Sequence, residues 1–384
     1  MRQGLILGWY LMSLIVDGII YQQQASGGIS NLFRALLPRI CDLDPMLQVM
    51  LFYSKRPLQT LPSHAHIRQV QIPALEQYIR PWRYFYPLGM SMRMQLARFY
   101  FSKYPNSLWH STYFTSMPSW PGPTVVTVHD MIYEHFPDIF KHPYDDYFRA
   151  QKRVCIQNAD VVLCDSETTM HDVINILSID SEKCRIVHLA CSSVFRVLKD
   201  TKADLHKQSG KPYLLYVGKR HPHKNFTTLA RAFSNWKYGQ DVNLIIASDS
   251  AWSQDELDLF TQLHIDKQLE LIHFPTDEQL CHLYNGASAL VFPSVYEGFG
   301  LPLLEAMSCG CPIIASRIPS TLEVAGDVPI YFNPGSPDEL IQAMNLVMDE
   351  GRDSPRVSRG LQQALRYSWD TTAQKTLEIY HSLL

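Results

Sequence analysis

Short apolar runs alternate with segments of helical periodicity along the first half of the chain. Such runs are typical of strands that are buried on both faces. The pattern predicts strands at 14–21, 47–53, 107–110, 124–129 and 161–164. It predicts helices at 33–40, 145–159 and 168–177. Strands that alternate with helices indicate an α/β fold, in which helices cover both faces of a parallel sheet.

A second series of the same kind follows the polar segment 199–212, which has no apolar period and is the best linker candidate. Its predicted strands are 213–217, 242–247, 269–274, 289–292, 312–315 and 328–332. Its predicted helices are 227–236, 255–263, 277–286, 302–309, 320–324, 337–349 and 369–384. Two such series predict two doubly wound domains, 1–200 and 201–365, and a closing helix, 366–384. Ligands of such domains bind beyond the carboxyl ends of the strands.

The first residues allow two interpretations. Residues 4–16 form a mostly apolar run of 13, which is shorter than the ~20 residues that cross a membrane. The run has the length of the apolar region of a signal peptide, with a cleavage point near 25–27. Asp17 falls where such a region should stay apolar, which favours a buried strand interrupted by Asp17 and Gly18. We expect residues 1–11 to be an upstream extension and Met12 to be the natural start.

Composition excludes several classes of protein. Hydrophobic residues make up 46% of the 384, which is enough for real cores and rules out global disorder. Lys and Arg total 34 against 37 Asp and Glu, so a globally basic nucleic-acid binder is not indicated. Eight cysteines without a CxxC pair do not resemble a disulfide framework, and a reduced cytoplasmic compartment is the simpler expectation.

One stretch departs from this even balance of charge. Residues 77–129 contain no acidic residue, and basic and aromatic side chains interleave there. A basic, aromatic surface attracts anionic lipid headgroups, so the stretch predicts peripheral contact with the inner face of a membrane. The alternative is that the aromatic residues belong to the core and the arginines form a solvated rim. No nucleic-acid-binding module accompanies the stretch, and we expect no nucleic-acid partner.

The segment 293–307 is the strongest chemical pattern in the chain. A buried strand ends at Pro293, a loop with two glycines follows, and Pro302 stands where the first turn of a helix tolerates proline. This order predicts outward-facing N–H groups at Gly300, Leu301 and Leu303, which form an anion site together with the helix dipole.

Two carboxylates accompany this anion site. Glu297 lies on the loop and Glu305 about one turn into the helix. Carboxylates beside a phosphate-binding loop suit hydrogen bonds from sugar hydroxyls. The alternative is that the glycines form an ordinary turn and both acids are solvated.

A basic cluster follows the first strand of the second series. Lys219, Arg220 and Lys224 lie close to Gly218, at the carboxyl end of the predicted strand. Three cations at such a position can neutralise a diphosphate, and arginine can bind it with two parallel hydrogen bonds. The alternative is an ordinary basic loop.

Two smaller features also follow predicted strands. Gly27 and Gly28 let a ligand approach the backbone because they carry no side chain, although a plain turn into a helix explains them equally. His129 can orient a polar substrate, although a lone histidine is more often structural.

Other chemistries find little support in the sequence. The pairs His64, His66 and His221, His223 have no nearby cysteine or acidic partner in sequence, so we expect no metal. The patterns GxSxG, Walker A and GxGxxG do not occur, which argues against hydrolases, NTPases and dinucleotide-dependent dehydrogenases.

Taken together, the segments 292–316 and 323–326 resemble the signature of retaining glycosyltransferase family 4, the group 1 glycosyltransferases, and the chain is similar to bacterial mannosyltransferases. The family's two glutamates, separated by seven residues, match Glu297 and Glu305. Its Gly-x-Arg…Lys-Asn element resembles 218–225, its Gly-Gly loop resembles 27–28, and its active-site histidine resembles His129. The resemblance implies the GT-B fold: two Rossmann-like domains face a cleft, and the last helix crosses back to pack on the first domain.

The resemblance also implies a set of site residues. The catalytic residues would be His129, Arg220, Lys224 and Glu297. The donor-binding residues would be Gly27, Gly28, Gly218, Gly298, Phe299, Gly300, Leu301 and Glu305.

The resemblance gives these residues separate roles. Arg220 and Lys224 would hold the diphosphate of a GDP- or UDP-linked sugar, and the spacing leaves Lys219 as a competitor of Arg220. Glu305 would bind the ribose, Glu297 the donor sugar, and His129 would lie near the reacting carbon. The implied reaction moves a hexose, mannose or glucose, to a glycan or glycolipid with retention and without a metal or other cofactor.

One departure and two competing functions accompany the resemblance. Where the family commonly has glycines after the second strand of its donor domain, this chain has Ala-Ser-Asp-Ser at 247–250. A catalytically degenerate nucleotide-sugar-binding protein would keep the fold without turnover. An enzyme is favoured by the presence of five residues: His129, Arg220, Lys224, Glu297 and Glu305. A sugar-nucleotide epimerase of similar fold would need acids in the first domain that the sequence does not identify.

Overall fold

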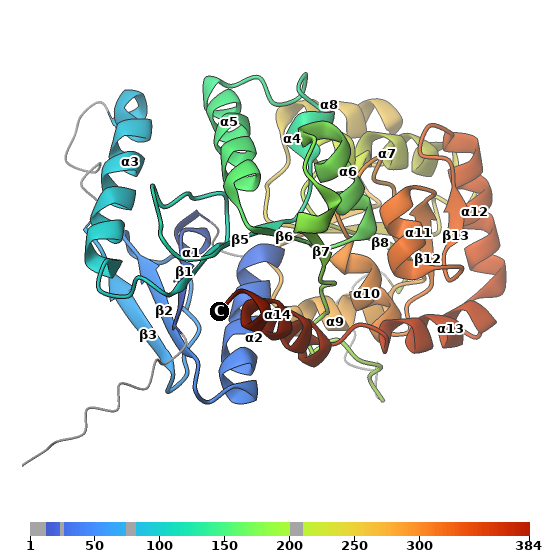
Figure 1. The fold of residues 1–384 in the computed structure, drawn as a ribbon. Coiled ribbons are helices and arrows are strands. Elements are labelled where there is room, and N and C mark those ends of the chain that lie inside the picture. Colours follow the sequence, from blue (N-terminus) through green and yellow to red (C-terminus); the bar gives the residue numbers. More distant parts are fainter. Residues whose placement is uncertain (1–12, 24–26, 74–81, 200–209) are drawn as a thin grey trace, which may run out of the picture.

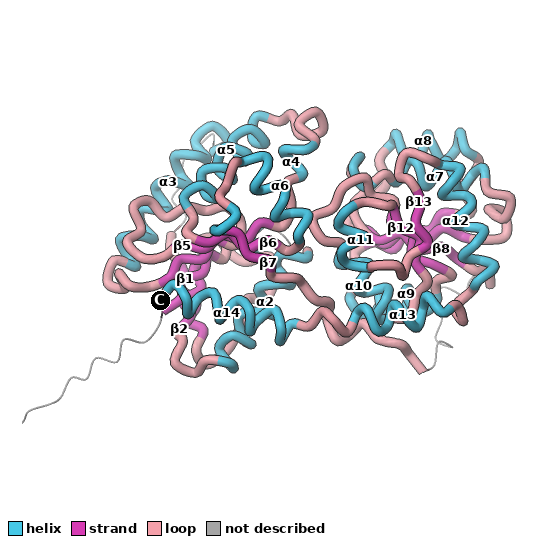
Figure 2. The backbone as a smooth tube through the Cα atoms, turned by 45° about the vertical axis from the view of Figure 1, so that its right-hand side comes forward, coloured by secondary structure: helices cyan, strands magenta, loops and turns pink. Residues whose placement is uncertain are grey.

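The computed structural model describes residues 13–23, 27–73, 82–199 and 210–384, and it contains two parallel β-sheets, each between layers of helices (Figure 1). Figure 2 shows the two sheets in separate halves of the molecule, each surrounded by its own helices. The predicted boundary between 200 and 201 and the predicted extension 1–11 lie outside the described residues.

The first sheet has seven strands in the order β3-β2-β1-β4-β5-β6-β7. Its strands are β1 (Ser13–Asp17), β2 (Gln48–Tyr53), β3 (Ile67–Gln71), β4 (Leu108–Ser111), β5 (Thr124–Val128), β6 (Val161–Cys164) and β7 (Cys184–Ile186). Its helices are α1 (Ile20–Gln23), α2 (Gly28–Leu43), α3 (Trp82–Phe101), α4 (Ile132–His135), α5 (Pro143–Asn158) and α6 (Glu167–Leu177), with a 3₁₀ turn at Ser181–Lys183.

The second sheet has six strands in the order β10-β9-β8-β11-β12-β13. Its strands are β8 (Tyr213–Val217), β9 (Asn243–Ser248), β10 (Leu269–His273), β11 (Ala289–Phe292), β12 (Ile313–Ser316) and β13 (Ile330–Phe332). Its helices are α7 (Phe226–Asn235), α8 (Gln254–Leu263), α9 (Asp277–Gly286), α10 (Leu301–Ser308), α11 (Pro319–Ala325), α12 (Pro337–Glu350) and α13 (Pro355–Ala364), with a 3₁₀ turn at Pro222–Lys224.

Alternation of side chains along each strand explains why the strands read as continuous apolar runs. Leu14 and Val16 pack on one face of the first sheet, in the same cluster as residues of α2, whereas Ile15 packs with α3 on the other face. In the second sheet Leu215 packs in the cluster of α9 and α10, and Leu214 in the cluster of α7 and α12. Both faces of both sheets are therefore covered, as predicted.

The last helix, α14 (Trp369–Leu383), returns to the first half of the molecule and lies beside α2 (Figure 1). Its Tyr380 is fully buried, and the Tyr380 hydroxyl lies 2.5 Å from Nδ1 of His110 on β4. Thr372 Oγ1 donates to the carbonyl of His188 at 2.7 Å. The crossing that the resemblance implied is therefore present.

The predicted strand 14–21 is wrong in its second half. The Asp17 carboxylate accepts a hydrogen bond from the Ile19 N–H at 2.6 Å, which turns the chain out of β1 and into the short helix α1. β3, β7, α1, α3, α4 and α13 were not predicted. The remaining predicted elements are present, with ends shifted by a few residues.

The described part of the acid-free stretch 77–129 divides between core and surface. The part in β4 and β5 is core, and Trp109 and Phe101 are buried in the cluster between α3 and the sheet. Arg93 is also buried, where its charge acts on the pKa of Asp17. The side chains of 74–87 lie outside the described residues. Only one face of α3 keeps the exposed apolar character that the sequence suggested.

Candidate active site

The predicted site residues lie at the carboxyl ends of strands on either side of the two topological switch points. The order of strands changes direction between β1 and β4 in the first sheet and between β8 and β11 in the second. The glycine pair follows β1 and α1, the basic cluster follows β8, and the loop 293–300 follows β11. Ligands of doubly wound sheets bind at such points.

The first turns of two helices, one from each half, meet at this place. A Cβ added to Gly28, the first residue of α2, would lie 3.0 Å from Cδ1 of Leu301, the first residue of α10. Gly300 caps α10 with φ 107°, a left-handed conformation that glycine adopts without strain. The prediction of an outward-facing N–H at Leu303 is wrong, because this N–H donates to the Gly300 carbonyl at 2.9 Å. Within the described residues, the N–H groups of Gly300 and Leu301 have no backbone acceptor.

Glu297 and Lys224 form an ion pair across the loops that follow β8 and β11. Nζ of Lys224 lies 2.7 Å from each oxygen of the Glu297 carboxylate. Ser294 Oγ donates to the same carboxylate at 2.6 Å, which fixes its orientation. A quarter of the Lys224 side chain is exposed.

Glu305 is partly buried at the second turn of α10. The hydroxyl of Tyr284 on α9 donates to Glu305 Oε2 at 2.8 Å. Burial raises the pKa of Glu305 to about 7, although the hydrogen bond from Tyr284 acts in the opposite direction. Glu305 therefore changes its protonation state near neutral pH.

Arg220 is buried and holds the loop that follows β9. Its Nε lies 2.5 Å from Oε1 of Glu256, and its Nη2 donates to the carbonyls of Ser250 and Ala251 at 3.1 and 2.7 Å. The guanidinium also stacks 4.4 Å above the ring of Trp252. Nη1 is buried and has no hydrogen-bond partner in the described part of the chain.

Lys219 differs from Arg220 in its exposure. Just over half of its side chain is exposed, and Nζ lies 3.4 Å from the carboxylate of Asp249. Asp249 belongs to the segment without glycines that follows β9, so this segment supplies partners to both cations. Neighbouring Gly218 has φ 128° and an open surrounding, which only glycine adopts freely.

His129 lies directly after β5 and is oriented by Asp165, which follows the neighbouring strand β6. Nδ1 of His129 lies 2.6 Å from Oδ2 of Asp165, and both side chains are at least nine-tenths buried. Burial lowers the pKa of His129, but the charge and hydrogen bond of Asp165 raise it, and the net pKa is above the ordinary value. The other ring nitrogen, Nε2, is buried and has no partner in the described residues.

The loop of the second half packs directly on the end of β5. A Cβ on Gly298 would lie 1.8 Å from the carbonyl oxygen of His129, so only glycine fits. The Gly298 carbonyl accepts hydrogen bonds from Ser166 Oγ at 2.5 Å and Thr169 Oγ1 at 3.2 Å. These contacts bring Glu297 and His129, which come from different sheets, to one place.

A carboxylate of α11 joins the two halves a second time. Glu323 accepts hydrogen bonds from the N–H groups of Glu167 and Thr168 at 2.7 and 3.2 Å, at the start of α6. Its carboxylate also lies 3.0 Å from Nε2 of His188. A carboxylate at a helix N-terminus is favoured by the helix dipole, so Glu323 stabilises this contact between the halves.

The other residues singled out in the sequence, Phe299, His221 and His223, pack against aromatic rings. Phe299 is buried, and its ring lies 6.1 Å from that of His188 and 5.8 Å from that of Tyr367. The rings of His221 and His223 stack 5.8 Å apart. In the described residues, no three His, Cys, Asp or Glu side chains gather as metal ligands.

Sequence reasoning missed Asp165, Tyr284 and Glu323. Asp165 had a usable signal, because it follows a predicted strand adjacent to the one that carries His129. Glu323 lies in the motif that carries the resemblance, but only the structure shows which helix it caps. Tyr284 lies inside an amphipathic helix, where nothing distinguishes it from a core aromatic residue.

We expect Asp165→Asn to lower kcat about tenfold and to change KM for the donor much less. Without the carboxylate, burial dominates and the pKa of His129 falls below its ordinary value of 6.5. Ring-proton NMR titration measures this pKa, and the acidic limb of the activity profile should move to lower pH.

The exposed pair of Asp42 and His64, 3.1 Å apart, supplies a matched control. Asp42→Asn should leave activity and the pKa of His129 unchanged. An unaltered pKa of His129 in Asp165→Asn would contradict the assignment of Asp165 as its positioning residue.

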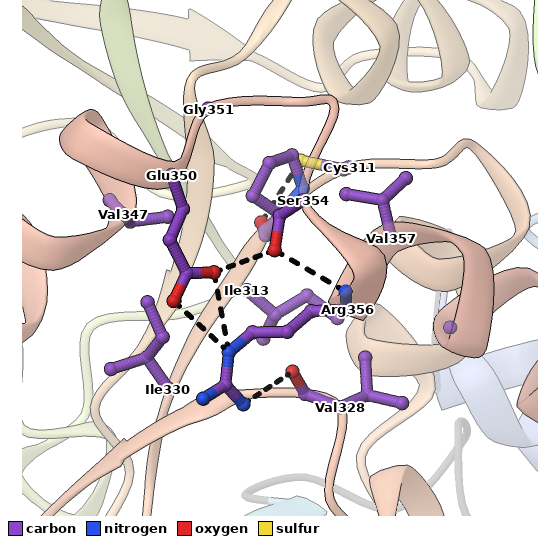
Figure 3. Close-up of a pocket in the computed structure, with 12 residues that line it drawn as sticks. Cys311, Ile313, Val328, Ile330, Val347, Glu350, Gly351, Ser354, Arg356 and Val357 are labelled. Carbon is purple, nitrogen blue, oxygen red and sulfur yellow. Dashed lines mark hydrogen bonds and ion pairs between the residues drawn. The ribbon is translucent and has the colours of Figure 1, made fainter.

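A separate small cavity lies between β12, β13, α12 and α13 (Figure 3). It has a volume of about 10 Å³, which is enough for about one water molecule. Ser354 Oγ donates to Glu350 at 2.6 Å, and Nε of Arg356 lies 3.3 Å from the same carboxylate. These contacts hold α13 against the end of α12. The cavity is too small to be a ligand site.

Comparisons with known proteins agree with this geometry. Residues 27–192 match the family model "Glycosyltransferase Family 4", and residues 199–362 match "Glycosyl transferases group 1". O-antigen chain mannosyltransferase B of Escherichia coli is 28% identical over 269 residues, which cover 67% of this chain and 70% of that protein.

Solved structures show the same fold. Sucrose-phosphate synthase from Thermosynechococcus elongatus superposes with a TM-score of 0.81 at 18% identity, covering 97% of this chain and 99% of the other. Anabaena HepE in complex with UDP-glucose superposes with a TM-score of 0.75 at 17% identity, covering 97% and 100%. No helix in the described residues is both long and apolar enough to cross a bilayer. The chain belongs to glycosyltransferase family 4, the group 1 glycosyltransferases, and is a hexosyltransferase with the GT-B fold.

Proposed function

We propose that this enzyme transfers mannose from a nucleotide diphosphate sugar to a lipid-linked glycan with retention of configuration and without a metal ion. The observation that carries the proposal is the meeting of the first turns of α2 and α10 beside the ion pair of Lys224 and Glu297. Two helix N-termini and an ammonium at one place suit a diphosphate. The similarity to an O-antigen chain mannosyltransferase supports mannose as the sugar and a glycan chain as the acceptor.

The nucleotide of the donor is either GDP or UDP in our proposal. One structural neighbour is in complex with UDP-glucose, so both GDP- and UDP-linked donors belong in the test. In our assignment Glu305 accepts hydrogen bonds from the ribose hydroxyls, and Glu297 accepts them from the donor sugar. Arg220 acts mainly by holding the loop after β9, and only its Nη1 is available to a phosphate oxygen.

The proposed chemistry follows the development of charge on the leaving group. As the glycosidic bond breaks, the diphosphate gains negative charge. Lys224 and the free N–H groups of Gly300 and Leu301 stabilise that charge. These groups supply the positive charge that a divalent cation provides elsewhere, which is why we propose a reaction without metal. Nε2 of His129 accepts a hydrogen bond from a hydroxyl of the donor sugar, because the ring proton is held at Nδ1 by Asp165.

The test is an assay with GDP-mannose, GDP-glucose, UDP-glucose and UDP-galactose, with and without EDTA. Thermal shift measures binding, and release of the nucleoside diphosphate measures slow donor hydrolysis. We expect GDP-mannose to give the largest shift and EDTA to have no effect. Binding without any turnover, even with lipid-linked acceptors, would instead identify a degenerate binding protein, and loss of turnover in EDTA would overturn metal independence.

We expect Lys224→Ala to weaken binding of the nucleoside diphosphate by about tenfold to a hundredfold, because a charge-assisted hydrogen bond contributes about 1.5–3 kcal/mol. Isothermal titration calorimetry measures the change. Lys237, an exposed lysine at the end of α7 that lies over the ring of Tyr238, gives the matched control. Equal affinity in Lys224→Ala and Lys237→Ala would contradict the placement of the diphosphate.

A further inference from the structure

Helix α3 has apolar side chains on two opposite faces. The inner face packs on the first sheet through Met90, Met94, Ala97 and Phe101. The outer face carries the residues we call the outer stripe, which are Leu88, Met92, Leu96 and Phe99. At about 100° per residue, the outer stripe falls within a sector of about 80° that lies almost opposite the inner face. A helix that only covers a sheet needs a single apolar face.

The outer stripe is exposed to an unusual degree. Phe99 is 81% exposed, Leu88 is 54% exposed, and Met92 and Leu96 are each 37% exposed. Single exposed apolar residues are normal on protein surfaces, but four in one row along three turns of helix are not. Figure 1 places α3 at the outer edge of the first half, on the side away from the second sheet. All four side chains are at least one-third exposed.

The charges around the outer stripe all have one sign along the chain. No acidic residue occurs between residues 77 and 129, which include the whole helix and the loop after it. Lys103 is exposed just beyond the end of α3, where its Nζ lies 4.8 Å from the ring centre of Tyr100. Arg98 is half-buried, and its Nη1 donates to the Pro118 carbonyl at 2.8 Å. An apolar row with positive charge beside it is complementary to a surface of anionic headgroups over acyl chains.

We propose that the outer stripe of α3 docks this enzyme on an anionic lipid surface, with the four apolar side chains inserted at the headgroup level and Lys103 among the headgroups. This inference goes beyond the proposed function, because it holds for any donor and acceptor. A second copy of the chain is a poorer occupant for two reasons. A two-fold interface would bring the same positive charges together, and a row of about 16 Å with four side chains is small for a stable dimer.

The test is co-sedimentation of the full chain with vesicles of phosphatidylcholine alone or with 30% phosphatidylglycerol. We expect binding to the anionic vesicles, weakening as salt is raised, and little binding to neutral ones. The double variant Leu96→Glu/Phe99→Glu should bind anionic vesicles at least tenfold more weakly. Leu365→Glu, at an apolar residue that is 76% exposed between α13 and α14, should bind like the wild type.

Two further measurements keep the proposal falsifiable. The thermal midpoint of the double variant should equal that of the wild type, because both side chains are exposed. If the midpoint is lower, vesicle binding is measured instead with Lys103→Glu. This variant should also bind anionic vesicles more weakly. Donor hydrolysis in solution without vesicles should be unchanged, which separates this inference from the enzymatic one. Absence of vesicle binding, equal binding to both vesicle types, or a dimer abolished by the double variant would overturn it.

Discussion

Gly298→Ala is expected to lower kcat/KM for the donor by more than a hundredfold and to reduce the thermal midpoint by several degrees. The added Cβ would lie 1.8 Å from the carbonyl oxygen of His129 and 2.9 Å from its carbonyl carbon. Both are backbone atoms at the end of β5, so they cannot move aside as a flexible side chain can. The loop itself must therefore shift away from the first sheet.

That shift has consequences on both sides of the contact. The Gly298 carbonyl would lose its hydrogen bonds from the buried hydroxyls of Ser166 and Thr169, which join the two halves at this place. Glu297, the neighbouring residue, would move relative to His129, and a displacement of about 1 Å at a catalytic group costs about a hundredfold in rate.

A second glycine provides the control for Gly298→Ala. A Cβ on Gly335 would meet Asn333 Oδ1 at 3.4 Å, an ordinary contact, so Gly335→Ala should leave activity and thermal midpoint nearly unchanged. Steady-state kinetics and differential scanning calorimetry on both variants measure the two effects. Wild-type activity in Gly298→Ala would show that the loop does not lie against β5 in solution.

Local sequence patterns predicted most elements of this fold, because buried parallel strands are continuous apolar runs and the helices between them have clear periodicity. The pattern failed where polar chemistry decides the path of the chain. At Asp17 a side-chain hydrogen bond to Ile19 ended an otherwise unbroken apolar run. In α3 two apolar faces blurred the period that identifies a helix.

The candidate site shows a similar division. Glu297, Glu305 and Lys224 could be assigned from spacing and resemblance, because their motif is continuous in the chain. Contacts between the two halves could not, since the pairing of Glu323 with the start of α6, or of Gly298 with His129, joins residues more than 150 positions apart. The surroundings of Arg220 also had no sequence signal, because Glu256 pairs with it from the first turn of α8.

Glu305→Gln is expected to make the protein more stable at pH 8.5 while it weakens binding of the nucleotide about a hundredfold. Burial raises the pKa of Glu305 from 4.5 to about 7, so ionisation of the folded protein is unfavourable. A raised carboxyl pKa means that stability is lost as pH rises from 4.5 through 7, by about 3 kcal/mol in full. Glutamine does not ionise, and the variant keeps the stability that the wild type loses.

Binding of the nucleotide is weakened because glutamine cannot supply the ionised carboxylate. A buried carboxylate accepts hydrogen bonds from two ribose hydroxyls more strongly than an amide oxygen does. The affinity of the wild type for the nucleoside diphosphate should therefore rise with pH up to about 7, relative to that of Glu305→Gln. Taking the ratio of the two affinities removes the titration of the phosphates, since both proteins bind the same ligand.

Melting curves at pH 5.5 and 8.5, together with calorimetric titrations over the same range, measure both effects. Exposed Glu278 on α9 provides the control, and Glu278→Gln should change neither property. Tyr284→Phe removes the hydrogen bond that lowers the pKa of Glu305, so its midpoint for nucleotide binding should move to higher pH. A stability difference between wild type and Glu305→Gln that is the same at both pH values would show that Glu305 does not titrate in this range. A stability difference that grows with pH shows that Glu305 ionises in the folded protein at a cost in stability.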